Sequence, residues 1–412
     1  GDTLARVLRF RGTPVEVQNY IDDTGVQVAD VIVGFRELEH RSVAEVAALA
    51  ESTRFDYYCW DLYSRVTEWY DEDKARLEVR AAALHDLEHG GNEVAAMGAL
   101  IVDRIVRAHL QTMARLNVSY DLLTYEGDIL RLHFWAHCFE TLKQQGAVYL
   151  QTEGKLKDCW VMKIEEPGGK SDPEAEAKLS PATDMNASAA TDMNASAASV
   201  GHDASVGDDP AGKEKVIVRS NGVVTYVGKD IANQFWKFGL LGKDFRYRPF
   251  MTQHTGQMLW ATTSQEGDVA APSFGKASRI FNVIDSRQSY LQALLSQALR
   301  TLGHPREAEN SIHFAYEMVA LSHATAKELG YPEEDGEARK PFVEVSGRKG
   351  LGVKVDDMLD LLIGKASKEV AARNPEFSDD ECRRVASQIA VGAIRYFMLK
   401  FGRGKLIVFD IE

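Results

Sequence analysis

The stretch VEVQNYIDDTGVQ, residues 15–27, joins an apolar run to a cluster of polar residues. Its first seven residues predict a buried strand, and Gly25 provides a turn before the next element. Polar side chains gather at the carboxyl ends of strands in open α/β sheets, because ligands bind there. Asp22 and Asp23 are therefore candidates for a binding site, although either could instead cap the helix that follows.

Outward from this strand, the chain alternates between strand patterns and helix patterns. Further strands are predicted in KDCWVMKI (157–164), IFNVID (280–285) and SIHFAYEMVAL (311–321). Residues 45–117 have helical spacing throughout, and 381–399 read as a long helix. Strands separated by helical segments favour a parallel α/β sheet, here with a large helical insertion and a mainly helical C-terminal region.

The composition is ordinary for a globular protein, with 45% hydrophobic and 26% charged residues in 412. No apolar run approaches the roughly 20 residues that cross a bilayer, and the start lacks the pattern of a secretory signal, so we expect a cytoplasmic protein. The 4 cysteines form no CxxC pair, which argues against a disulfide framework and a Cys-rich zinc site. A net charge of −13 disfavours indiscriminate nucleic-acid binding but allows a local basic patch for one RNA.

The composition changes between residues 165 and 213, where Ala, Ser, Asp, Gly and Pro dominate. The octapeptide ATDMNASA occurs at 182–189 and again at 190–197. Two polar units are too few for a solenoid, so we predict a disordered, low-complexity surface loop.

The segment HDLEH (85–89) matches the HxxEH pattern of inverted zinc peptidases. A catalytic zinc also needs a third ligand on a neighbouring element, and the following Gly90-Gly91 would end this helix. The interpretation as an ordinary helix is therefore preferred, and no metal site is predicted. The same holds for HFWAHC (133–138), which is typical of a helix lining the core.

The segment KVIVRSNGVVTYVGKDIA (215–232) carries Asn221-Gly222 between two β-branched runs, which is a strong hairpin signal. It places Tyr226 at the end of a hairpin strand and Asp230 where a helix begins. Asp230 could cap that helix, or it could project with Tyr226 into a pocket and pair with a guanidinium. Glu126 in TYEGD is a second acid near a strand or turn.

The segment EVSGRKGLGVKVDDML (344–359) places two adjacent cations between glycines, just before an amphipathic helix. A solvated surface turn is one interpretation. A phosphate-binding loop is the other, because small residues allow close approach and cations stabilise phosphate charge.

In this order, the segments resemble the motifs of the arginyl-tRNA synthetases, which are class I aminoacyl-tRNA synthetases. NYIDDTGVQ is similar to N-Y-x-x-D-x-G-x-Q, DLLTYEGD to F-D-x-x-x-x-E-S, and RSNGVVTYVGKDIA to S-D-G-T-x-T-Y-x-x-x-D-I-A. VIDSRQ resembles a strand ending in glutamine, and VSGRKG resembles M-S-x-R-K-G, the form of the KMSKS loop in that family. The resemblance covers nearly the whole chain apart from the 165–213 insert.

The resemblance implies a Rossmann-type core that forms arginyl-adenylate from ATP and arginine, with Mg²⁺ on the triphosphate, and then charges tRNA(Arg). It assigns the arginine substrate to Tyr226, Asp230, Gln288, Glu126 and Gln27. The loop for ATP phosphates and tRNA would comprise Ser346, Gly347, Arg348, Lys349 and Gly350. Further pocket candidates are Asn19, Asp23, Asp285 and His313.

The resemblance also predicts how the chain is divided. We expect the first part of the catalytic core at 1–35, a mainly helical insertion at 36–118, the second part of the core at 119–300, and the SGRKG loop with a helical tRNA-contacting region at 301–412. The family's His-x-Gly-His segment and anticodon-binding domain are absent, so we expect a fragment of a monomeric enzyme that has little activity alone. The alternatives are a non-catalytic paralogue that binds arginine or tRNA, and a zinc peptidase.

Overall fold

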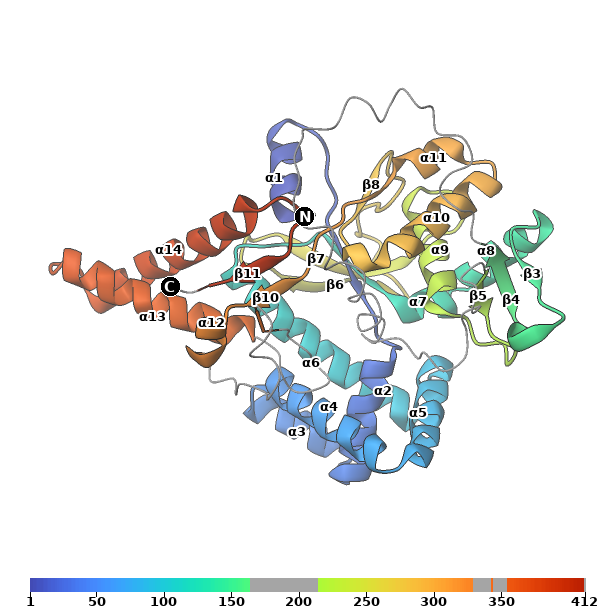
Figure 1. Cartoon of the computed structure of the whole chain (residues 1–412), viewed down its shortest axis with the longest axis horizontal. Helices are drawn as coiled ribbons and strands as arrows, with labels where there is room; N and C mark the ends of the chain where they lie inside the picture. Colours follow the sequence, from blue (N-terminus) through green and yellow to red (C-terminus); the bar gives the residue numbers. More distant parts are fainter. Residues whose placement is uncertain (164–213, 329–341, 344–353, 411–412) are drawn as a thin grey trace, which may run out of the picture.

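The computed structural model describes residues 1–163, 214–328, 342–343 and 354–410 (Figure 1). The 165–213 insert and the loop Ser346–Gly350 lie outside the described residues. In the part of the chain that is described, none of the helices combines the length and the apolar character that a bilayer span requires.

The central sheet has four strands in the order β1 (Gln18–Ile21), β2 (Leu122–Tyr125), β7 (Met258–Thr263) and β6 (Arg246–Thr252). The first three are parallel, and β6 is antiparallel to β7. Ile21 of β1 pairs with Tyr125 of β2, so these strands end side by side at one edge. The prediction of an α/β fold with a parallel sheet is confirmed.

Three smaller sheets surround the central one. Strand β8 (Ile280–Asn282) pairs in parallel with β9 (Ser311–His313), and β10 (Val319–Leu321) pairs in parallel with β11 (Ile407–Phe409). An antiparallel sheet contains β3 (Tyr149–Leu150), β4 (Trp160–Lys163) and β5 (Glu214–Val218).

Five helices form a helical region with its own core below the sheet in Figure 1. They are α2 (Val26–Val33), α3 (Val43–Ser52), α4 (Phe55–Glu72), α5 (Leu77–His89) and α6 (Glu93–Arg115). Phe35, Leu62 and Ile101 are fully or almost fully buried in this core. The predicted helical character of residues 45–117 is confirmed, and α2 follows directly from the turn at Gly25.

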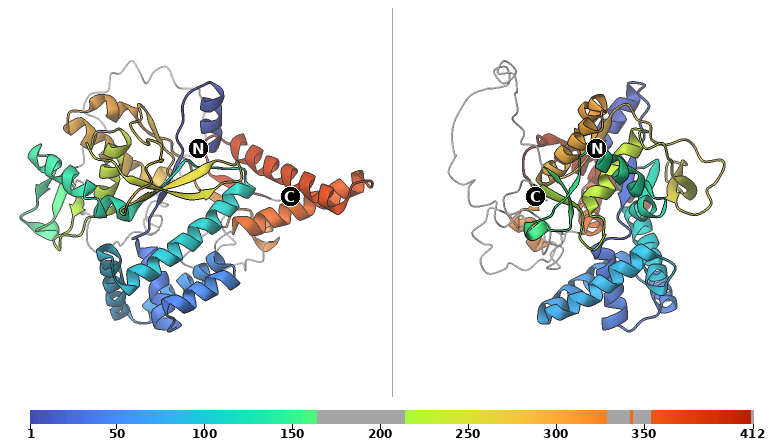
Figure 2. Two further views of the ribbon diagram at one scale, coloured as in Figure 1. Left: turned by 180° about the vertical axis from the view of Figure 1, so that it is seen from behind. Right: turned by 90° about the vertical axis from the view of Figure 1, so that its right-hand side faces the viewer.

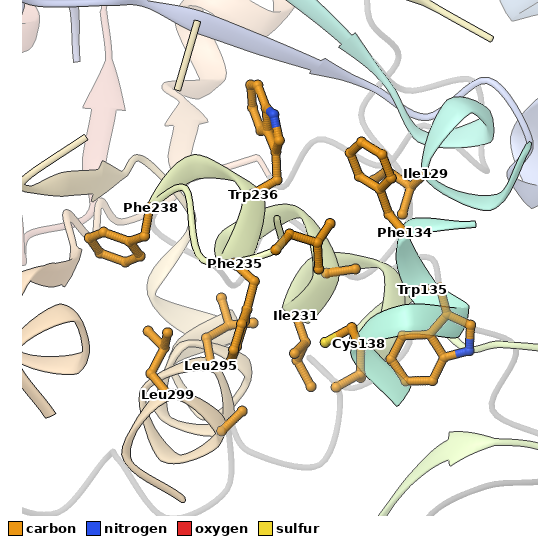
Figure 3. Packing of buried hydrophobic residues seen from close by; sticks show 14 of the residues in the cluster. Ile129, Phe134, Trp135, Cys138, Ile231, Phe235, Trp236, Phe238, Leu295 and Leu299 are labelled. Atoms are coloured by element: carbon orange, nitrogen blue, oxygen red, sulfur yellow. The ribbon is translucent and has the colours of Figure 1, made fainter. Parts of the chain in front are cut away.

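The largest core is formed mainly by side chains of four helices (Figure 3). They are α7 (Glu126–Arg131), α8 (Phe134–Gln144), α9 (Tyr226–Lys237) and α10 (Ser289–Thr301); α11 (Pro305–Asn310) follows α10. Helix α9 contributes Ile231, Phe235 and Trp236 to this core, while α10 contributes Leu295 and Leu299. In the first turn of α9, Lys229 is buried and contacts Glu126, the residue that follows β2.

The remaining helices are α1 (Asp2–Phe10), α12 (His323–Glu328), α13 (Val355–Arg373) and α14 (Asp379–Lys400). Helices α13 and α14 pack against each other and extend away from the central sheet (Figure 2). The helical character predicted for the C-terminal region is confirmed.

Several predicted elements differ in extent or type. The strand expected at 15–21 covers only residues 18–21, and the one expected at 311–321 divides into β9 and β10, which join different sheets. The turn at Asn221-Gly222 forms, and Val218 bridges Val224, but Tyr226 already begins α9 rather than ending a second strand. Thr225 explains this change, because its hydroxyl bonds back to β5 while its extended backbone starts the helix.

Candidate functional site

Four parts of the fold meet at one edge of the central sheet. Asp22 and Asp23 follow β1, Glu126 follows β2 as the first residue of α7, and Asp230 lies in the first turns of α9. Parallel pairing of β1 with β2 brings the first two parts together, and packing of α9 over α7 adds the third. Helix α5 approaches from the helical region through Glu88.

The carboxylate of Glu126 lies at the centre of this site and is buried. One oxygen, Oε2, accepts a hydrogen bond of 2.9 Å from the hydroxyl of Tyr20. The other, Oε1, accepts from Lys229 Nζ at 2.7 Å and from the Thr24 hydroxyl at 3.3 Å. Both oxygens of this carboxylate are therefore engaged.

Lys229 is buried too, with 5% of its surface exposed, and its ammonium also lies 3.6 Å from Glu88 Oε1. Burial alone would lower the pKa of Lys229, but the carboxylates of Glu126 and Glu88 raise it above its ordinary value. The ammonium therefore stays charged and balances part of the acidic charge of the site.

Asp22 and Asp230 add further negative charge. Burial, followed by repulsion from Glu126, raises the pKa of each to about 7. Two carboxyls that are poised near neutrality take up or release protons according to the charge placed beside them. A cationic ligand would therefore favour the ionised form of both.

Asp23 has a structural place beside this pocket. Its Oδ1 accepts from the Gly127 N–H at 2.7 Å, and its Oδ2 lies 3.4 Å from Arg131. Burial raises the pKa of Asp23. Asp128 pairs with the same arginine at 3.2 Å and accepts from Thr262 at 2.8 Å. These bonds tie the end of β1 to α7 and to β7, so they hold the site in shape.

The other predicted residues lie around two helix starts. Tyr226 and Asp230 are four residues apart on α9, and the Tyr226 hydroxyl bonds that of Tyr290 on α10. Gln288 is the N-cap residue of α10, so the starts of these two helices meet. Lys215 Nζ lies 5.8 Å from the ring centre of Tyr226 and 5.2 Å from that of Tyr290.

Three of the further pocket candidates, and Gln27 of the arginine set, lie in other surroundings. Asp285 binds Arg287 through both its oxygens, at 2.9 and 2.8 Å, and His313 Nε2 lies 3.0 Å from the Ile284 carbonyl. Asn19 lies within β1, and Gln27 lies in the first turn of α2.

Sequence reasoning missed Tyr20, Thr24, Lys229 and Glu88. Tyr20 and Thr24 were inside the quoted NYIDDTGVQ motif, and Lys229 precedes Asp230 in TYVGKD. A lysine beside a candidate acid was a usable signal. No signal in the sequence connected Glu88 with Lys229, because 141 positions separate the two residues.

The histidines and carboxylates of the HDLEH segment are not arranged as a zinc site would require. Within residues 1–163, 214–328, 342–343 and 354–410, no group of three His, Cys, Asp or Glu side chains is arranged to hold a metal. In HDLEH the rings of His85 and His89 pack at 4.0 Å, while Glu88 turns to Lys229. Asn233, one turn after Asp230, has a buried Oδ1 without a hydrogen-bond partner, which a ligand N–H could satisfy.

Known proteins resemble this chain in sequence and in fold. A family model described as tRNA synthetases class I (R), catalytic domain, matches residues 250–411. The arginine–tRNA ligase of Thermococcus sibiricus is 31% identical over 420 residues, and that of Thermus thermophilus is 33% identical over 414. Each match covers 100% of this chain and 56% of the relative, so the chain spans about half the length of the curated relatives it matches.

The solved structures agree with the sequence matches. The Thermus thermophilus arginyl-tRNA synthetase superposes with a TM-score of 0.70 and 29% identity, over 99% of this chain and 55% of that one. The Plasmodium falciparum arginyl-tRNA synthetase shares the fold, with a TM-score of 0.57. It is 12% identical, and the match covers 99% of this chain and 49% of that one. On these matches and on its parallel sheet, the chain is similar over its whole length to arginyl-tRNA synthetases, and its residues 250–411 match the catalytic domain of class I tRNA synthetases.

Proposed function

We propose that the protein containing this chain is an arginine–tRNA ligase. It activates arginine with ATP to arginyl-adenylate and pyrophosphate, and then transfers the arginyl group to the terminal adenosine of tRNA(Arg). The observation that carries the proposal is the convergence of Asp22, Glu126 and Asp230 where β1 and β2 end and α9 begins, with Glu126 buried among them. Three acids at one site suit a substrate whose side chain is a permanent cation.

Arginine recognition follows from the shape of its guanidinium. Two parallel N–H groups can meet the two oxygens of one carboxylate, and the pair is strongest where water is excluded. We assign this role to Glu126 and Asp230, with Tyr226 bordering the pocket from the start of α9. Gln288 and Gln27 complete the set of residues that the motifs assign to the amino acid.

ATP is the co-substrate in this proposal, with Mg²⁺ bridging its phosphates. The motif assigns the phosphates and the tRNA end to Ser346, Gly347, Arg348, Lys349 and Gly350. Cations in a glycine-flanked loop suit this role, because they offset the charge that develops on the phosphate during transfer. We further propose that the enzyme works in the cytoplasm as a monomer.

The test is pyrophosphate exchange by the protein from its complete gene, with and without arginine and tRNA(Arg). Wild type should exchange only when arginine is present. Asp230→Asn should raise the KM for arginine by more than tenfold, since truncating one partner of a buried charge pair costs roughly 2–5 kcal/mol. Asp379→Asn, an exposed acid on α14, serves as the matched control and should leave the KM unchanged.

The result also separates the proposal from its rival. Binding of arginine without any exchange would identify a non-catalytic paralogue. Absence of both arginine binding and exchange would overturn the proposal altogether.

A further inference from the structure

We propose that Lys229 is an internal competitor for the arginine pocket, and that Glu88 is a positioning residue that receives it when arginine binds. The proposal rests on the proposed function and adds a step that the motifs do not assign. Without substrate, Lys229 pairs with Glu126; with substrate, its ammonium moves to Glu88 and frees the carboxylate.

The first argument is occupancy. Tyr20 takes one oxygen of Glu126, while Lys229 and Thr24 take the other. A guanidinium that binds both oxygens in parallel needs Oε1 free of its present ammonium partner. Substrate binding to Glu126 therefore requires Lys229 to leave.

The second argument is the destination. Glu88 Oε1 is already 3.6 Å from the ammonium, which is ion-pair distance but longer than a hydrogen bond. A lysine has a flexible four-carbon stem, so its ammonium can shift between two carboxylates while the backbone of α9 stays fixed. Glu88 is also the more exposed of the two acids, at 26% of its side chain against 7% for Glu126.

The third argument is charge. Burying a guanidinium beside a charged ammonium would place two cations in a pocket of low dielectric, where their repulsion is strong. The charged groups that face Lys229 are Glu126, Glu88, Asp22 and Asp230. Glu88 alone among them comes from the helical region rather than from the sheet edge, α7 or α9, so moving toward it takes the ammonium away from the substrate.

Competition between Lys229 and the substrate for Glu126 would increase the selectivity of the site for arginine over lysine. A guanidinium displaces an ammonium from a carboxylate because it forms two parallel hydrogen bonds where the ammonium forms one. A free lysine would exchange one ammonium for another and gain nothing. Lys229 would therefore raise the selectivity for arginine over lysine, a difference that is measured as a ratio of affinities.

The experiment measures the Kd of arginine and of lysine by calorimetry on the protein from its complete gene. The variants are Glu88→Gln, Lys229→Met and the double variant, with Glu78→Gln on the exposed part of α5 as the control. We expect Glu88→Gln to weaken arginine binding about tenfold in wild type and not at all in the Lys229→Met background. We also expect Lys229→Met to lower the ratio of the affinity for arginine to the affinity for lysine.

The possible results are distinguishable. If wild type binds no arginine, the proposed function fails and this inference with it. If wild type binds arginine but Glu88→Gln leaves the Kd unchanged, or the two substitutions act additively, only the inference is overturned. Should Lys229→Met fail to fold, Lys229→Gln replaces it, and a Glu88→Gln protein with wild-type arginine affinity still refutes the proposal.

Discussion

Under the proposed function, Asp22 and Asp230 would make arginine binding dependent on pH. Burial and the charge of Glu126 raise the pKa of each to about 7, so both are partly protonated at neutrality. A bound guanidinium favours their ionised forms. We expect the affinity for arginine to rise as the pH increases from 6 to 8, by up to about tenfold per pH unit for each carboxyl that must ionise.

The same two carboxyls also make stability depend on pH. Their contribution to the free energy of unfolding falls as the pH rises, whereas the affinity for arginine is expected to increase. In the unfolded chain an aspartic acid titrates near its ordinary pKa of 3.8, so between about pH 4 and pH 7 the native state holds protons that the unfolded state has lost. These groups lower the free energy of unfolding as the pH rises through that window. Saturating arginine should therefore raise Tm more at pH 8 than at pH 6, and Asp230→Asn should reduce that difference. A Tm increase independent of pH would contradict the assignment.

Asp30 illustrates a buried charge with a structural role. It is 1% exposed and binds the Arg80 guanidinium through both oxygens, at 2.7 and 2.9 Å. We expect Asp30→Ala to lower the free energy of unfolding by roughly 3–5 kcal/mol, because it leaves Arg80 partly buried without its partner. Urea unfolding measures this loss. Glu369→Ala, which breaks an exposed pair with Arg373, is the control and should change almost nothing.

At the scale of residues, the sequence identified the acids of the site but not their partners. Glu126 and Asp230 stood out because acids at strand ends and helix starts are recognisable by type. The pairing of Lys229 with Glu126 could not be predicted, since 103 positions separate these two residues. Asp22 and Asp23 are adjacent in sequence, but they have different roles in the fold. Asp23 accepts a hydrogen bond from the Gly127 N–H, whereas Asp22 is one of the acids of the candidate site, and the sequence alone does not distinguish the two.

At the scale of elements, Gly34, the C-cap residue of α2, allows this end of the helix to pack closely against α4. A Cβ at this position would lie 2.6 Å from Leu62 Cγ and 2.8 Å from Val66 Cγ2, and both side chains are fully buried. We expect Gly34→Ala to lower the free energy of unfolding by about 1–3 kcal/mol, through overpacking. Thermal unfolding tests this expectation.

The control for Gly34 is another helical glycine. Gly392 lies within α14, and a Cβ there would meet no atom within 4 Å. Gly392→Ala should therefore raise the free energy of unfolding by about 0.5–1 kcal/mol, since alanine lowers the entropy of the unfolded chain. Equal effects at both glycines would show that the close packing at Gly34 is unimportant here.

Helices were predicted better than strands for a physical reason. The stripe of apolar residues that defines α6 or α14 is local, and it shows in the sequence at the spacing of a helical turn. A strand exists only where a partner supplies hydrogen bonds. The segment 311–321 therefore divides into two strands, because its first residues pair with β8 and its last residues pair with β11. The helix at Tyr226 depends likewise on the bond from Thr225 to β5.

At the scale of the whole molecule, polar contacts connect parts that are far apart in the sequence. Arg395 of α14 binds Asp2 of α1 and donates to the Leu116 carbonyl, just after α6, at 3.1 Å. Asp356, at the start of α13, accepts from Thr112 of α6 at 2.7 Å and also binds Arg115. The pair α13–α14 is thus attached at both of its helices. Sequence analysis predicted the helical C-terminal region but none of these attachments, which form between residues with no local pattern.

Asp356 carries the last prediction. Its side chain is 13% exposed, and Arg54, the N-cap residue of α4, approaches it at 3.4 Å in addition to the two partners from α6. Asp356→Ala should speed amide hydrogen exchange in α13 and α14 while leaving exchange in β2 unchanged, because the attachment is lost but the sheet keeps its own core. Asp360→Ala is the control: it removes a second partner of Arg115, but one whose side chain is 63% exposed, so its effect should be small. Faster exchange throughout the chain would instead mean that α13 and α14 unfold together with the sheet, as one cooperative unit.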